Sequence, residues 1–149
     1  MKKIIFLSVF VILFTSSLKS QTRGFGMGII LGEPTGLSAK LWTGSNNAFD
    51  FAAAWSFRGS GHILMQADYV WHTTNLLSSG AGRMPFYYGI GGRIILADDP
   101  LLGVRIPLGL NYQFSGAPLD IFVEIVPILD LTPETDFDVG GGIGIRFWF

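Results

Sequence analysis

The chain has 149 residues, with 10 basic and 11 acidic side chains, 20 glycines and no cysteine, and its mean hydropathy is positive at +0.45. The lack of cysteine excludes disulfides, thiolate zinc sites and a lipid on an N-terminal cysteine. The slightly acidic charge argues against nucleic acid as a partner.

Residues 1–20 have the pattern of a secretory signal peptide. Lys2 and Lys3 form a basic start, an apolar core covers 4–14, and a mostly polar segment follows. The core is too short to cross a bilayer as a helix. We predict cleavage within a few residues of Ser20. The domain at 21–149 would then keep 7 basic residues against 11 acidic ones, a formal charge of 7 − 11 = −4.

From residue 24 onward, apolar residues recur at every second position, and turn residues interrupt them at short intervals. This period predicts β-strands, and no later stretch has a helical period or an apolar run of 18 residues. Eight strands are predicted, in chain order, over 24–31, 37–43, 48–57, 62–72, 85–97, 102–114, 119–131 and 137–149. The longest connection is expected at 73–84. Tilted strands of about ten residues would cover the apolar band, about 25 Å tall, of a membrane barrel.

Each predicted strand has one apolar face and one face of small or polar residues, as in the alternation of Phe49 and Phe51 with Asp50 and Ala52. Eight strands close around an interior only just wide enough for side chains, so the crowded apolar face is expected outside. Such a face is stable against lipid and not against water. The sequence therefore predicts an all-β, eight-stranded antiparallel up-and-down transmembrane β-barrel. A soluble lipocalin-like periplasmic barrel, with its apolar face inside, is the alternative.

Aromatic residues gather near the barrel end that is predicted to hold both termini. Such a girdle is typical of a membrane interface. Trp55, Phe57 and Phe137 lie at the other end. Trp42 has inward parity, so a bulge or a shifted register is expected there. The residues predicted at the first end are Phe25, Trp42, Phe49, Phe51, Tyr69, Trp71, Phe86, Tyr88, Tyr112, Phe114, Phe147 and Phe149.

The polar face carries charges of both signs, which we predict to form a paired network inside the barrel. Lys40 is expected beside Asp50, Arg146 beside Asp120, and Arg93 and Arg105 near Glu124. Paired charges in a narrow interior act as a plug and fix the register of the strands. A gated conduit for ions or small solutes is the alternative, although eight strands leave too little bore for a standing channel. The predicted network consists of Lys40, Asp50, Asp68, Arg93, Arg105, Asp120, Glu124 and Arg146.

An enzyme is the third alternative, because a lipid-modifying site needs a histidine near a serine or a carboxylate at the outer end. His62 is predicted there, near Ser60, with Asp98 and Asp99 on a neighbouring loop. His72 is predicted at the opposite end. No hydrolase motif accompanies these residues. The glycine clusters at 89–92 and 140–144 do not join a strand to a helix, as a phosphate-binding loop would. We therefore expect no enzyme, no catalytic residue, no cofactor and no metal.

Several runs resemble a family of small bacterial outer-membrane proteins whose function is not assigned. They are the runs at 32–38, 85–93, 118–124 and 125–131 and the closing Gly-Ile-Gly-Ile-Arg-Phe-Trp-Phe. The resemblance covers essentially all of 21–149 and implies an OmpA-type eight-stranded barrel in the outer membrane of a Gram-negative bacterium. It implies no catalytic or ligand residues. The short outer loops differ from the long ones of OmpA-type barrels.

The spacing of Gly144, Phe147 and Phe149 resembles the C-terminal signal that outer-membrane barrels present to their assembly machinery. The partners expected on this basis are the barrel-assembly machinery and outer-membrane lipid. A structural or surface-interaction role is the first expectation for function. The sequence leaves the ligand and the oligomeric state open.

Overall fold

The computed structural model describes residues 24–55 and 62–149, and the predicted signal peptide lies outside this part of the chain. The regular secondary structure of these residues consists of β-strands alone, so the all-β prediction is confirmed. The described residues contain no helix that is long and apolar enough to cross a membrane. The strands are β1 (Phe25–Glu33), β2 (Gly36–Trp42), β3 (Asn47–Trp55), β4 (Ile63–Ser79), β5 (Gly82–Leu96), β6 (Leu101–Arg105), β7 (Leu108–Phe114), β8 (Leu119–Thr132) and β9 (Asp136–Trp148).

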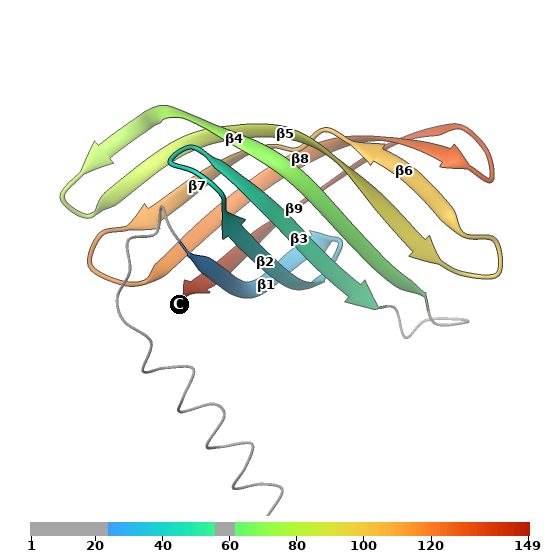
Figure 1. Cartoon of the computed structure of the whole chain (residues 1–149), viewed down its shortest axis with the longest axis horizontal. Coiled ribbons are helices and arrows are strands. Elements are labelled where there is room, and N and C mark those ends of the chain that lie inside the picture. Colours follow the sequence, from blue (N-terminus) through green and yellow to red (C-terminus); the bar gives the residue numbers. More distant parts are fainter. Residues whose placement is uncertain (1–23, 56–61) are drawn as a thin grey trace, which may run out of the picture.

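All strand pairs are antiparallel, and together they close into a ring. β5 pairs with both β6 and β7, and each of these pairs with β8, so the nine strands fill eight places. β9 closes the ring against β1, and Figure 1 shows the C-terminus next to the start of β1. We call this end of the ring the terminal end and the opposite end the far end.

The predicted sixth strand is interrupted in the structure. β6 ends at Arg105 and β7 begins at Leu108, because Pro107 has no N–H to donate to a ladder. The register against β8 is the same on both sides of the break, with Arg105 opposite Ile128 and Leu108 opposite Ile125. The break therefore leaves the two pieces in one place of the ring.

The predicted long connection at 73–84 is wrong. β4 and β5 continue as a hairpin through this segment, and only Gly80 and Ala81 separate them. The register shifts twice along the hairpin, between His72 and Asn75 and again between Asn75 and Leu77. Such irregularities break the simple alternation on which the sequence prediction relied.

The two faces of the ring differ in polarity as the alternation predicts. The outward face is apolar and exposed, with Ile29, Leu31, Leu37, Phe51, Met65, Ile90, Ile125, Val139 and Ile143 among its residues. The inward face holds the buried polar side chains Ser38, Lys40, Gln66, Asp68, His72, Arg105, Asn111, Gln113, Asp120, Asp130 and Arg146. The closed ring thus has the reverse of the polarity of a protein folded in water.

The expected bulge or register shift at Trp42 is wrong. Trp42 lies opposite Ala48 in a ladder that runs without a break from Gly36. Its side chain is buried inside the ring, with ring centroids 4.5 Å from His72 and 6.2 Å from Trp148. Trp42 therefore belongs to the interior and not to the outward aromatic residues.

Candidate functional site: the charged interior

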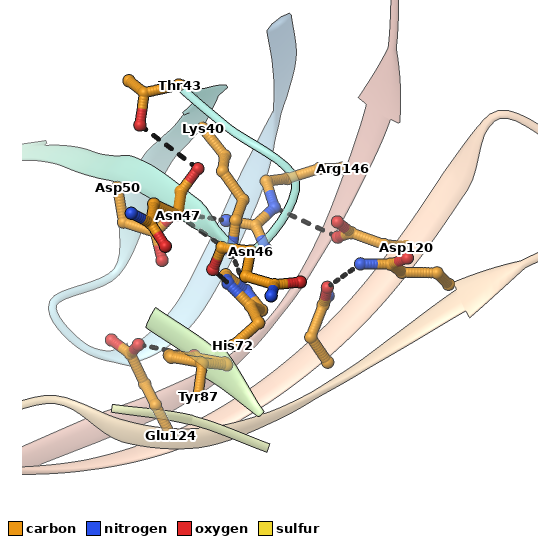
Figure 2. A network of polar contacts seen from close by, with 12 residues as sticks. Lys40, Thr43, Asn46, Asn47, Asp50, His72, Tyr87, Asp120, Glu124 and Arg146 are labelled. Atoms are coloured by element: carbon orange, nitrogen blue, oxygen red, sulfur yellow. Dashed lines mark hydrogen bonds and ion pairs between the residues drawn. The ribbon is translucent and has the colours of Figure 1, made fainter. Parts of the chain in front are cut away.

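Arg146 is the centre of a buried cluster near the terminal end. Its Nε donates to Asp120 Oδ1 at 3.0 Å, and its Nη1 lies 3.5 Å from Asp50 Oδ1. The guanidinium carbon sits 4.1 Å from the ring centroid of Phe122. Trp148 Nε1 donates to the second oxygen of Asp120 at 3.0 Å. Arg146 and Asp120, which we predicted as neighbours, are almost completely buried here (Figure 2).

Lys40 joins this cluster from β2. Its Nζ lies 3.3 Å from Asp50 Oδ1, the predicted neighbour, and 2.8 Å from His72 Nε2. His72 Nδ1 is 3.1 Å from the carbonyl oxygen of Asn46, in the turn between β2 and β3. Nζ also lies about 5 Å from the ring centroids of Trp42 and Tyr87. Side chains from neighbouring and distant strands therefore share this buried ammonium group, as Figure 2 shows.

The strand register explains why Asp50 and Asp68 need separate cations. These two aspartates lie directly opposite each other on β3 and β4, where like charges destabilise the pairing. Asp50 is held by Lys40 and Arg146. Asp68 accepts a hydrogen bond from Arg105 Nε at 3.0 Å. Each carboxylate therefore has a cation within reach on another strand.

Glu124 connects the Arg146 side of the interior with the middle of the ring. Tyr87 donates its hydroxyl hydrogen to Glu124 Oε2 at 2.8 Å. The other oxygen of Glu124 lies 3.6 Å from Arg105 Nη2, so Arg105 is near Glu124 as predicted. Arg105 Nη1 donates to Gln66 Oε1 at 2.5 Å. The interior is thus filled by connected side chains from β4, β5, β6 and β8.

Arg93 is not near Glu124, and this part of the prediction needs correction. Its Nη2 lies 2.6 Å from Asp130 Oδ2 and 3.2 Å from Asp138 Oδ2, while its Nε donates to Asp130 Oδ1 at 3.0 Å. The strand register explains the shift: Arg93 lies opposite Gly103 on β6, and Gly103 lies opposite Asp130 on β8. Because glycine has no side chain, Arg93 reaches across it to Asp130.

The partners that the sequence prediction missed include Asp130, Asp138, His72 and Tyr87. Parity places Asp130 and Tyr87 on the inward face, but parity does not say which inward residue of another strand lies nearby. The sequence predicts His72 at the rim, as the last residue of its strand. Its burial follows from the continuation of β4 beyond the predicted strand end.

The predicted assembly-signal residues lie on β9 and just after it. Gly144 faces inward against Phe122, and a side chain there would overlap the Phe122 ring. Phe147 and Phe149 are in edge contact with ring centroids 5.2 Å apart. Phe149 also stacks on Phe25 at 6.4 Å and donates its backbone N–H to the Phe25 carbonyl at 2.9 Å. This contact ties the two ends of the described chain together.

The candidate catalytic residues lie apart from the charged interior. The described residues contain no group of three or more His, Asp or Glu side chains placed to hold a metal ion. His62 is exposed at the far end, Asp98 and Asp99 are exposed in the turn between β5 and β6, and Ser60 lies outside the described residues. Comparisons with protein-family models, with curated proteins and with solved structures gave no match. The geometry of this chain is therefore the basis for its proposed function.

Proposed function

We propose that this chain is an integral outer-membrane β-barrel whose interior is closed by its charge network and which has a structural or surface-interaction role. The observation that carries the proposal is the reversed polarity of the closed ring. On neighbouring strands, Ile125 of β8 is 57% exposed and Arg146 of β9 is 1% exposed. Lipid accepts an apolar outer surface of this kind, and water does not.

Closure of the ring supports insertion in a second way. A spanning structure must satisfy its backbone hydrogen bonds internally, and among sheets only a closed one does so. Every strand place in the ring has a partner on both sides. A soluble barrel with an apolar ligand would need the opposite arrangement, because its interior would then hold the apolar side chains.

The outward aromatic residues near the terminal end support a defined position in the membrane. Phe49 contacts Tyr69 and Tyr69 contacts Trp71, each with ring centroids 4.9 Å apart, and Trp71 stacks on Tyr88 at 5.9 Å. This row crosses β3, β4 and β5. Aromatic rows of this kind are typical of the lipid headgroup level in membrane barrels, which supports a position of the terminal end at one interface.

The filled interior favours a closed barrel over a conduit. Lys40, Asp120 and Arg146 are each no more than 1% exposed. Tyr87 is also fully buried, and its hydroxyl group donates a hydrogen bond to Glu124. Moving a solute past this level would require separating buried ion pairs, which costs several kcal/mol per ion. We therefore assign the network a structural role, that of holding the strands in register.

Replacing Ile125 with Arg tests whether the outward face contacts lipid. Ile125 lies near the middle of β8 and faces outward. A charge at the membrane midplane costs about 2–4 kcal/mol, so Ile125→Arg is expected to lower the free energy of unfolding in lipid vesicles by that amount. Ile125→Ala is the matched control for lost apolar contact. Equal stability of the two variants would contradict a lipid-facing position.

Phe149→Ala tests localisation and the contact that ties β9 to β1. The variant loses the contacts of Phe149 with Phe25 and Phe147. We therefore expect less protein in the outer-membrane fraction. We also expect less of the folded species, whose migration on a gel changes on boiling. Phe137→Ala is the control, because Phe137 is an outward aromatic residue at the other end of β9 and has none of these contacts with Phe25 and Phe147. Recovery of the unaltered protein as a soluble periplasmic species would overturn the proposal.

A further inference from the structure

The outward face of the ring carries an apolar hollow of about 670 Å³, a volume within the range of ligand sites, about 300–1,000 Å³. Its centre consists of small residues on the neighbouring strands β2 to β5, namely Ala39, Ala53, Ala67 and Gly92. Ala67 lies between Phe51 and Gly92 in the ladder, and Ala53 is the next outward residue after Phe51 on β3. The hollow therefore follows from missing side-chain volume on a face that otherwise holds large apolar residues.

Large apolar side chains form the walls of the hollow. Leu37 lies opposite Ala53 on one side and Met65 lies opposite it on the other. Both walls are 45% exposed, whereas Ala53 between them is only half-exposed to the same side as part of the floor. Arg93 also borders the hollow, but its guanidinium group points inward to Asp130. The surface that a ligand would meet is thus almost wholly apolar.

Strand packing does not require the glycine at position 92. A Cβ at Gly92 would meet only the carbonyl oxygen of Gly103 within 4 Å, at an ordinary contact distance of 3.4 Å. At the preceding Gly91, in contrast, a Cβ would overlap the side chain and backbone of Asp68. The space above Gly92 is therefore open to the hollow, and a larger residue there would fill it without pressing on a neighbouring strand.

The hollow begins beside the outward aromatic row near the terminal end. Phe49 and Tyr69 of that row face each other, and the next outward pair towards the far end is Phe51 and Ala67. Two residues of a strand advance by about 7 Å. With the row at the level of the lipid headgroups, the hollow lies at the depth of the acyl chains of the same leaflet.

Charge and symmetry disfavour two other occupants of the hollow. A headgroup or a polar solute would lose its hydrogen bonds to water and meet almost no polar surface in return. A second copy of the chain, related by a two-fold axis, would place the same patch on both sides of the interface. Hollow would then face hollow, and the void between them would cost packing contacts.

We propose that the hollow binds one acyl chain of a phospholipid whose headgroup lies at the aromatic row. A flexible apolar chain fills an apolar hollow without desolvating a polar group. The inference rests on the proposed function, because only a ring in lipid presents this face to acyl chains. It adds a specific lipid site to a surface that would otherwise only be solvated by lipid.

The test is native mass spectrometry of the refolded protein in an oligo-oxyethylene detergent, titrated with dioleoylphosphatidylcholine or dioleoylphosphatidylglycerol. These probes have the same acyl chains and differ in headgroup charge. The expected result is one bound phospholipid per chain that saturates and is retained equally for both probes. A series of adducts that never saturates, retention of only one headgroup, or two protein chains per complex would each overturn the inference.

Ala67→Trp is expected to fill the hollow and to abolish the bound phospholipid. Gly92→Leu is the second filled variant, because the space above Gly92 accepts a side chain. Val123→Trp is the control: Val123 faces outward on β8, is not part of the lining, and should leave lipid retention unchanged. Heat-modifiable migration of each variant shows that its ring is intact.

The two proposals fail in different ways. If the unaltered protein shows heat-modifiable migration but retains no phospholipid, or if both filled variants retain it, the lipid site is wrong and the barrel stands. If the unaltered protein does not show heat-modifiable migration, the barrel itself is wrong and the lipid site with it.

Discussion

Arg146→Ala is expected to destabilise the protein by about 3–5 kcal/mol, one of the two largest effects we predict. The substitution removes the cation that contacts both Asp120 and Asp50 and leaves two carboxylates in the interior with fewer partners. Asp120 is fully buried and would keep only the hydrogen bond from Trp148. Breaking one side of a buried ion pair costs about this much, because the remaining charge stays desolvated. Urea unfolding in lipid vesicles measures the loss.

Two comparisons separate the buried charge from the loss of side-chain volume. Arg83→Ala removes a partly buried arginine whose Nη2 donates to Gln113 at 2.7 Å, and it is expected to cost about 1 kcal/mol. Arg146→Met combined with Asp120→Asn removes the pair together and should recover part of the stability lost in Arg146→Ala. An Arg146→Ala variant as stable as Arg83→Ala would mean that the network does not hold the interior together.

Gly28→Ala is expected to prevent normal closure of the ring between β1 and β9. A Cβ at Gly28 would overlap the carbonyl oxygen of Ile145 and lie 2.7 Å from the Cα of Arg146. Both atoms belong to the backbone of the partner strand, so no side chain can move aside. We expect a loss of about 3 kcal/mol or more, because overpacking typically costs about 1–3 kcal/mol and the overlap here is with backbone atoms that cannot move aside. The fraction of refolded protein with heat-modifiable migration measures it.

Gly44→Ala is the matched control for Gly28→Ala. It makes the same chemical change in the turn between β2 and β3, where an added Cβ meets no described atom within 4 Å. This variant should refold like the unaltered protein. If Gly28→Ala also refolded normally, the close approach of β1 and β9 at this position would be wrong, and the ring would have to be wider there.

The alternation of apolar and polar residues predicted most of the strands and the faces of their side chains. Period-two patterns placed the strands, and the parity of Asp50 with Lys40 and of Arg146 with Asp120 put these charges on one face. Local chemistry suffices for these inferences, because successive side chains of a strand point to opposite faces whatever the strand pairs with. The sequence also showed which face was apolar.

The predictions failed where a long-range register or an irregularity decided the outcome. Arg93 pairs with Asp130 because Gly103 lies between them on β6, and no pattern within one strand reveals this neighbour. Trp42 faces inward as its parity required, and only the packing of β2, β4 and β9 showed room for its ring. The β4–β5 hairpin continues through register shifts that erase the alternation at 73–84.

The sequence by itself thus determined the all-β class, the approximate strands and the membership of the inward charged face. The tertiary structure decided the closure of the ring and the partners of each charge. The physical reason is that side-chain direction is a local property of a strand, whereas charge partners come from strands far apart in the chain. Their distances depend on the register of every pairing between them, which only the closed ring fixes.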